Sequence, residues 1–165
     1  MASSSAEVAF LPHARTTIFE TVCIRTGSRV LSIGCGNGDL SRFVARLTGP
    51  QGEVVAVDSR EAALALARAA GREPDAGPIT YRAADLAADL HDLGRFEAIV
   101  GRRVLMYLPD ASATLARLVG LANLRAILAF QEHARASLPF GLAALSLHHA
   151  FTIGCGTQLR PRAAM

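Results

Sequence analysis

The sequence predicts a single α/β domain in which a mostly parallel sheet is covered by helices on both faces. Short apolar, β-rich runs alternate with longer segments of helical periodicity, and this alternation is typical of successive strand–helix–strand units. A chain of 165 residues with 51% hydrophobic residues can bury one sizeable core, but it is short for two independent domains. We therefore expect three layers of secondary structure built around one sheet.

The predicted elements follow one another in order from residue 29. Five runs are apolar enough for strands that are buried on both faces: Arg29–Ile33, Glu53–Val57, Ile79–Arg82, Phe96–Val100 and Ala126–Phe130. Helices are expected at Asp39–Leu47, Arg60–Ala70 and Ala111–Ala122, where apolar side chains recur on one face. Asp110 is suited to cap the amino end of the last of these helices.

Two flanking segments are less regular than this core of residues 29–131. Residues 1–28 predict an arm with a helix around Thr16 to Ile24, and residues 132–165 predict a helix over Leu138 to His149 followed by a short tail. The tetrapeptide Ile-Gly-Cys-Gly occurs at Ile33 and again at Ile153, but only the first copy is predicted to lie between a strand and a helix. We interpret the second copy as coincidence.

Charge and cysteine content argue against several classes of protein. The net charge is +3, and although all 17 basic residues are arginines, they are scattered without interleaved aromatic residues, so a nucleic-acid partner is not expected. The three cysteines form no CxxC pair, and His148 and His149 are adjacent, so neither a disulfide framework nor a metal site is expected. Without a secretory signal or an apolar run of roughly 20 residues, we expect a cytoplasmic protein with no membrane segment.

Alternating glycines lead from the first strand into the first helix, in the run Ser32-Ile33-Gly34-Cys35-Gly36-Asn37-Gly38-Asp39. Glycine permits the turn and lets a ligand approach the backbone, and the start of the following helix offers free amides. The dinucleotide fingerprint needs a small third residue at position 39, where Asp39 would repel a pyrophosphate. The loop therefore favours a ligand without phosphate groups over a nicotinamide dinucleotide.

Asp58 closes the second predicted strand about 20 residues after the loop, which is the usual position of a ribose-binding acid in such units. Its carboxylate can accept hydrogen bonds from both ribose hydroxyls, and the alternative role is an N-cap of the next helix. The glycine spacing together with Asp58 resembles the class I S-adenosylmethionine-dependent methyltransferases, whose fold is Rossmann-like. The run from Phe96 to Asp110, which ends Tyr107-Leu108-Pro109-Asp110, is similar to the family's fourth strand and following loop. The resemblance covers roughly the first 130 residues.

This resemblance implies S-adenosyl-L-methionine as the cofactor and a set of residues around it. Asp85 matches the acid that accepts from the adenine amine and Leu86 the neighbouring amide, with a cap on the segment Leu86 to Leu90 as the alternative role of Asp85. Arg103 either faces the substrate or extends over the protein surface. Gly101 and Arg102 are expected at the methionine end of the cofactor. The implied cofactor-binding residues are Gly34, Cys35, Gly36, Gly38, Asp58, Ser59, Asp85, Leu86, Gly101 and Arg102.

The reaction that the resemblance implies is transfer of a methyl group to a small-molecule acceptor by direct displacement, with positioning and desolvation supplying much of the rate. His133, at the carboxyl end of the fifth predicted strand, is the candidate general base, and an ordinary polar loop residue is the alternative. The competing hypothesis is a truncated, non-catalytic methyltransferase-like module that serves interaction.

The sequence departs from the family pattern at three points. Ser32 stands where the family commonly has an acid, and Ala122-Asn123-Leu124-Arg125 replaces a turn rich in proline and glycine. The family's final strands are not recognisable after Gln131, so Ala126–Phe130 would form a hydrophobic edge of the sheet. We expect the C-terminal helix or a partner to cover this edge, and a second copy of the chain, giving a homodimer, is one such partner.

Overall fold

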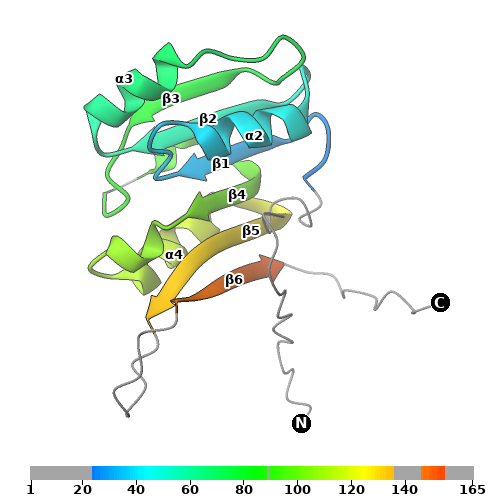
Figure 1. Cartoon of the computed structure of the whole chain (residues 1–165). Coiled ribbons are helices and arrows are strands. Elements are labelled where there is room, and N and C mark those ends of the chain that lie inside the picture. The colour runs from blue at the N-terminus through cyan, green and yellow to red at the C-terminus, as the bar shows by residue number, and fades with distance from the viewer. Residues whose placement is uncertain (1–23, 89, 136–145, 155–165) are drawn as a thin grey trace, which may run out of the picture.

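The computed structural model describes residues 24–88, 90–135 and 146–154, which build one sheet with helices on both faces (Figure 1). The strand order of this six-stranded sheet is β3-β2-β1-β4-β5-β6. The strands are β1 (Arg29–Ile33), β2 (Glu53–Asp58), β3 (Ile79–Ala83), β4 (Phe96–Arg102), β5 (Ala122–Arg135) and β6 (Ser146–Gly154). The helices are α2 (Asp39–Thr48), α3 (Glu61–Ala69) and α4 (Ala111–Gly120), with short 3₁₀ turns η1 (His91–Leu93) and η2 (Leu105–Tyr107).

The order of the strands creates a crevice at one edge of the sheet. β1 pairs in parallel with β2 on one side and with β4 on the other, so the chain runs outward from β1 in both directions. The carboxyl ends of these parallel strands meet at the same edge, where the chain order reverses between β1 and β4. Such a switch point is where open α/β sheets bind ligands.

The core lies on both faces of the sheet, because alternate residues of each strand point to opposite layers. Val30 of β1 packs in one cluster with Val44 of α2, whereas Leu31 packs in another with Leu118 of α4. All four side chains have no exposed surface. Burial of each contributes roughly 1.5–3 kcal/mol, and the need for it on both faces explains why the strands are almost continuously apolar.

The predicted α/β class and its parallel strands are confirmed, and the main boundary difference lies before β5. We expected a helix to Ala122 and a strand from Ala126, but α4 ends at Gly120 and β5 already begins at Ala122. The pairing of β4 with β5 shifts register between Phe96 and Ala98, and Arg125 takes a left-handed φ of 68° there. A bulge therefore lies where Ala122-Asn123-Leu124-Arg125 replaces the proline- and glycine-rich turn of the family pattern.

The predicted C-terminal helix over Leu138 to His149 is wrong at residues 146–149, which belong to β6. β6 runs antiparallel to β5, with Leu128 opposite Ile153 and Phe130 opposite Phe151. The expected hydrophobic edge at Ala126–Phe130 is therefore paired, and one of the final strands that seemed missing is present. The remaining part of the predicted helix and most of the predicted helix around Thr16 to Ile24 lie outside the described residues.

Candidate functional site

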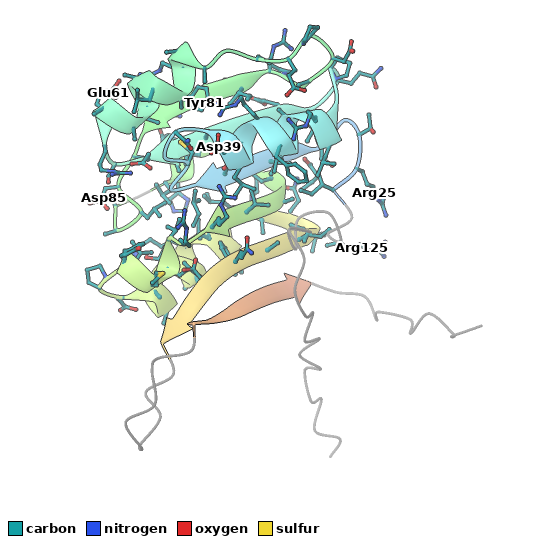
Figure 2. The ribbon with its side chains drawn as sticks, in the orientation of Figure 1. Arg25, Asp39, Glu61, Tyr81, Asp85 and Arg125 are labelled. Carbon is teal, nitrogen blue, oxygen red and sulfur yellow. The ribbon has the colours of Figure 1, made fainter. Side chains whose placement is uncertain are left out.

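A cleft of about 650 Å³ opens at the carboxyl ends of β1, β2 and β4, at the switch point of the sheet. Figure 2 shows Asp85 toward this end of the sheet and Arg125 toward the opposite end. The cleft is lined by Gly34, Cys35, Gly36, Asn37, Leu40, Asp58, Ser59, Arg60, Ala84, Asp85, Leu86, Arg102, Arg103, Val104, Tyr107 and Leu108. Most of the residues expected at the site from the sequence are thus brought together.

The glycine loop forms the floor of the cleft. At Gly34, φ is 54°, and a Cβ atom would lie 2.3 Å from Cγ2 of Val104, so a side chain is excluded by the protein itself. At Gly36, φ is also 54°, but a Cβ atom would meet nothing within 4 Å, so here the backbone lies open to the cleft. Gly36 is therefore the point where a ligand can press against the main chain.

Two glycines expected at the site lie beside it instead. Gly38 is the N-cap of α2, and a Cβ atom there would come within 2.8 Å of the Tyr81 hydroxyl. At Gly101, a Cβ atom would lie 2.9 Å from Cγ1 of Ile33 and 3.0 Å from the ring of Phe130. Neither residue is among those that line the cleft. Both allow close packing behind the cleft wall.

Asp58 joins the glycine loop to the loop before α3. Its Oδ2 accepts a hydrogen bond from the Gly36 amide at 2.9 Å, and its Oδ1 accepts one from the Arg60 amide at 2.9 Å. The residue is only 7% exposed, yet it lines the cleft. Each carboxylate oxygen can accept more than one hydrogen bond, so the two oxygens of Asp58 can still accept hydrogen bonds from a ligand.

Asp85 and Leu86 form the far wall, beside Ser59. Asp85 Oδ1 accepts a hydrogen bond from the Ala87 amide at 2.9 Å, so the carboxylate caps the start of the following segment, in which residues 86–88 form a turn and not a helix. Leu86 is 8% exposed and belongs to the core cluster below the cleft. The wall thus offers one carboxylate beside an apolar surface.

The opposite wall is the segment after β4. Arg102 and Arg103 line the cleft, and Arg103 has a left-handed φ of 54°. The Arg103 amide donates to the Gln131 carbonyl oxygen at 2.8 Å, which fixes this turn against β5. The sequence predicted Arg102 at the site and left Arg103 open between facing the substrate and extending over the surface, and it gave no sign of the unusual backbone at Arg103.

Glu132 holds this wall in place, a role that the sequence did not reveal. Its Oε1 accepts from the amides of Val104 and Leu105, both at 3.0 Å, and its Oε2 accepts from the Met106 amide at 3.3 Å. Glu132 is 8% exposed. Its neighbour His133, the candidate base, lies on β5 opposite His148, and its side chain is outside the described part of the structure.

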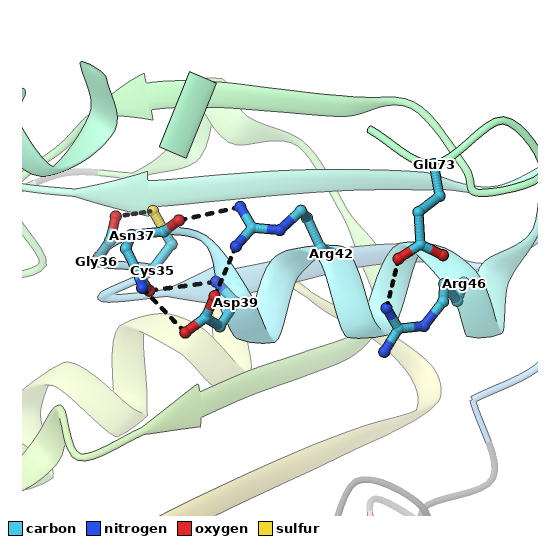
Figure 3. A network of polar contacts seen from close by, with 7 residues as sticks. All are labelled: Cys35, Gly36, Asn37, Asp39, Arg42, Arg46 and Glu73. Atoms are coloured by element: carbon cyan, nitrogen blue, oxygen red, sulfur yellow. Dashed lines mark hydrogen bonds and ion pairs between the residues drawn. The ribbon is translucent and has the colours of Figure 1, made fainter. Parts of the chain in front are cut away.

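A polar network supports the outer side of the glycine loop (Figure 3). Arg42 pairs with Asp39 Oδ1 at 2.6 Å and donates to the Asn37 carbonyl oxygen at 3.1 Å. Asp39 Oδ2 also accepts from the Asn37 amide group at 2.9 Å. The acid at the start of α2 is therefore tied to the loop and to an arginine of the same helix.

Two further groups near the loop are buried and do not supply a charge. Burial, and then the nearby charge of Asp58, raise the pKa of the Cys35 thiol to about 11, so the thiol is protonated at neutral pH. Ser32 has no exposed surface and accepts a hydrogen bond from the Ser41 hydroxyl at 3.0 Å. It is not among the residues that line the cleft.

The described residues contain no group of three or more side chains suited to hold a metal ion. In the same part of the chain, none of the helices is both long enough and apolar enough to cross a bilayer.

Comparison with known proteins gives the family. Residues 30–123 match the model of the methyltransferase domain. Nocamycin O-methyltransferase of Saccharothrix syringae is 31% identical over 108 residues, which is 66% of this chain and 38% of that protein. Ubiquinone biosynthesis O-methyltransferase of Xanthomonas oryzae pv. oryzae is 36% identical over 92 residues, 54% of this chain and 36% of that protein. The chain thus spans less than two fifths of the length of these relatives.

Solved structures agree with this result. The S-adenosylmethionine-dependent methyltransferase of Mesorhizobium loti superposes with a TM-score of 0.57 at 27% identity, covering 70% of this chain and 51% of that one. A methyltransferase of Aquifex aeolicus shares the fold, with a TM-score of 0.62 at 18% identity over 75% of this chain and 66% of that one. From the family match and these likenesses, the chain belongs to the methyltransferase-domain family of class I S-adenosylmethionine-dependent methyltransferases.

Proposed function

We propose that this chain binds S-adenosyl-L-methionine in the cleft and directs its methyl group to a small-molecule acceptor. The observation that carries the proposal is the Asp58 carboxylate, which is held by the Gly36 amide at 2.9 Å beside backbone that lies open to the cleft. A fixed acid next to an accessible main chain suits a ribose with two neighbouring hydroxyl groups. The family membership supports the choice of cofactor.

The other walls of the cleft fit the remaining parts of this cofactor. Leu86 presents an apolar surface for an adenine ring, and Asp85 has a second carboxylate oxygen beyond the one that accepts from Ala87. The guanidinium of Arg102 suits a carboxylate at the methionine end. When bound, the cofactor supplies a sulfonium methyl group that a nucleophile on the acceptor takes up by direct displacement.

The contribution of the chain is then positioning and exclusion of water. Asp58 and the loop at Gly36 fix the nucleoside, and the segment from Arg102 to Leu108 closes the side on which an acceptor approaches. Alignment of two reactants is worth several kcal/mol of the barrier, so the site works without a covalent enzyme intermediate. The Cys35 thiol is protonated and therefore a poor nucleophile, which is consistent with a reaction that forms no covalent enzyme intermediate.

The acceptor is proposed to react through an oxygen atom, because the relatives named O-methyltransferases match over 108 and 92 residues, whereas a relative named a C-methyltransferase matches over 45 residues. His133 is our candidate for the base that removes the proton from that oxygen, on the ground of its position at the end of β5.

A non-catalytic module is the competing function. A methyl-transfer assay over a panel of hydroxylated small molecules separates the two functions, because only the enzyme transfers labelled methyl groups.

The cofactor assignment is tested by calorimetric titration with S-adenosylhomocysteine, with NAD as the control ligand. We expect S-adenosylhomocysteine to bind, NAD not to bind, and Asp58→Ala to weaken binding ~tenfold or more, since a hydrogen bond to a charged group is worth about 1.5–3 kcal/mol. Asp58→Asn keeps the shape of the side chain and tests whether the charge matters.

Glu73→Ala is the matched control, because Glu73 is an exposed carboxylate paired with Arg46 at 2.8 Å and is not among the cleft residues. The affinity of Glu73→Ala for S-adenosylhomocysteine should equal that of the wild type. Circular dichroism checks that each variant is folded. Binding of NAD by the wild type, or unchanged affinity in folded Asp58→Ala, would contradict the proposal.

A further inference from the structure

The arginines of the described residues differ in their partners. Six pair with a carboxylate, namely Arg29, Arg42, Arg46, Arg60, Arg68 and Arg82, and the guanidinium groups of Arg72 and Arg95 donate to backbone carbonyl oxygens. The guanidinium groups of Arg25, Arg102, Arg103, Arg117 and Arg125 make no ion pair or hydrogen bond with any described residue. Of these five residues, Arg102 and Arg103 line the cleft. Two adjacent arginines thus line the cleft without a carboxylate partner among the described residues.

The acids around the cleft are engaged elsewhere and do not neutralise this pair. Asp58 accepts from the amides of Gly36 and Arg60, and Asp85 accepts from the Ala87 amide on the far wall. Glu132 follows Gln131, whose carbonyl oxygen accepts from the Arg103 amide, but both carboxylate oxygens of Glu132 accept from backbone amides of residues 104–106. The positive charge of the wall is therefore available to a ligand.

The backbone at Arg103 is held in a conformation that disfavours a large side chain. A left-handed φ of 54° is unfavourable for a residue other than glycine, and the hydrogen bond from the Arg103 amide to the Gln131 carbonyl oxygen retains it. Glycine would remove this cost, whereas the chain carries arginine. Strain of this kind that is kept beside a cleft is a pointer to a role for the side chain in that cleft.

The same wall continues as an apolar and aromatic surface. Val104, Tyr107 and Leu108 line the cleft, and Tyr107 is 73% exposed while the neighbouring Met106 is 44% exposed. The three amide contacts to Glu132 hold this segment in place. The wall thus combines arginine side chains on a backbone that is held in place with an exposed aromatic ring, which suits a molecule that has an apolar body and an anionic end.

On the basis of the proposed function, we propose that Arg103 forms an anion-binding subsite that selects a methyl acceptor with a carboxylate group beside an aromatic body. Arg102 then serves the carboxylate of the cofactor, and Arg103 the carboxylate of the acceptor. Charge balance favours this division, because the bound cofactor carries one net positive charge and an anionic acceptor offsets it within a partly desolvated cleft.

The test uses the full chain saturated with S-adenosylhomocysteine and two pairs of probes. The probes are 4-hydroxybenzoate and 6-hydroxy-2-naphthoate, each compared with its neutral carboxamide by calorimetric titration. The proposal expects each carboxylate to bind ~tenfold or more tightly than its carboxamide in the wild type, since a charge-assisted contact is roughly twice as strong as a neutral one. In Arg103→Gln the two members of each pair should bind alike, and Arg103→Lys should restore part of the preference.

Arg117→Gln is the matched control, because it removes the same charge from an exposed position on α4 that is not among the cleft residues. Arg117→Gln should keep the wild-type preference for carboxylates over carboxamides. Failure of S-adenosylhomocysteine to bind the wild type would overturn the proposed function itself. If S-adenosylhomocysteine binds, three results would overturn only the anion subsite. These are no preference for carboxylates over carboxamides, no binding of either probe pair, and a loss of the preference in Arg117→Gln as large as in Arg103→Gln.

Discussion

The thiol of Cys35 shows how one residue in the glycine loop couples the site to stability. It is 6% exposed and lies under the influence of the Asp58 carboxylate, and burial is the larger of the two causes that raise its pKa from 9.0 to about 11. The folded protein therefore holds a proton that the unfolded chain releases between these two pH values. The resulting stabilisation is complete below about pH 9 and is lost as the pH rises through about 11.

We predict that the free energy of unfolding falls more steeply with pH in the wild type than in Cys35→Ala. Between pH 8 and pH 10.5 the extra loss should be up to about 2 kcal/mol, because each pKa unit corresponds to about 1.4 kcal/mol. Urea unfolding at the two pH values measures it, and the packing change caused by alanine cancels in the difference between them. Equal losses in both proteins would show that the thiol does not have a raised pKa.

At the scale of single residues, the sequence predicted which positions surround the cleft better than what each one does there. Gly34 and Gly36 were both assigned to the cofactor and both line the cleft, but a Cβ atom at Gly34 would meet Val104, whereas one at Gly36 would meet nothing within 4 Å. Spacing along the chain places residues at the end of a strand, yet it does not say which packs behind the wall and which faces the cleft. That distinction depends on residues far away in sequence, as with Ile33 and Phe130 around Gly101.

The segment from β4 to η2 is the element that gives the cleft its cationic and aromatic wall. No local signal predicts that Glu132 would hold it, because the carboxylate contacts amides 26–28 residues earlier in the chain. The buried carboxylate serves the start of η2 in the way that an N-cap residue serves an α-helix. Loss of this side chain should therefore loosen the wall and not only remove one side chain from the core.

We predict that Glu132→Ala lowers the free energy of unfolding by about 3 kcal/mol, and that Glu132→Gln lowers it by about half as much. Alanine leaves the amides of residues 104–106 without their acceptor, whereas glutamine keeps one neutral oxygen. Urea unfolding gives the energies, and amide hydrogen exchange at residues 104–106 shows whether the loss is local. Glu73→Ala, at an exposed ion pair, should stay close to the wild type. An equally small effect in Glu132→Ala would contradict the role of Glu132.

β6 shows why the C-terminal strand of the sheet was not predicted from the sequence. The segment before it and its first residues suggested a helix, but Ser146–Gly154 forms a strand because it pairs with β5 along the length from Ile127 to Arg135. Strand preference depends strongly on such tertiary context, more than helix preference does. The buried central strands were easier to predict, since two apolar faces leave an unambiguous run of residues.

For the molecule as a whole, β6 answers the question of what covers the apolar edge of the parallel sheet. Without it, β5 would present Ile127, Leu128 and Phe130 together with unpaired backbone groups, and such an edge readily pairs with another chain. The expectation of a homodimer rested on that edge being open. Because β6 occupies the edge, self-association through β5 should require the removal of β6.

We predict that a chain ending at residue 145 self-associates, whereas a chain ending at residue 154 behaves like the full-length protein. The first truncation removes β6 and exposes β5, and the second retains all of the described pairing between the two strands. Sedimentation velocity at several protein concentrations measures the effect as a sedimentation coefficient that rises with concentration in the shorter chain alone. If both truncated chains sediment as the full-length protein does, β6 is not what protects the edge, and cover by another segment of the chain would have to be sought.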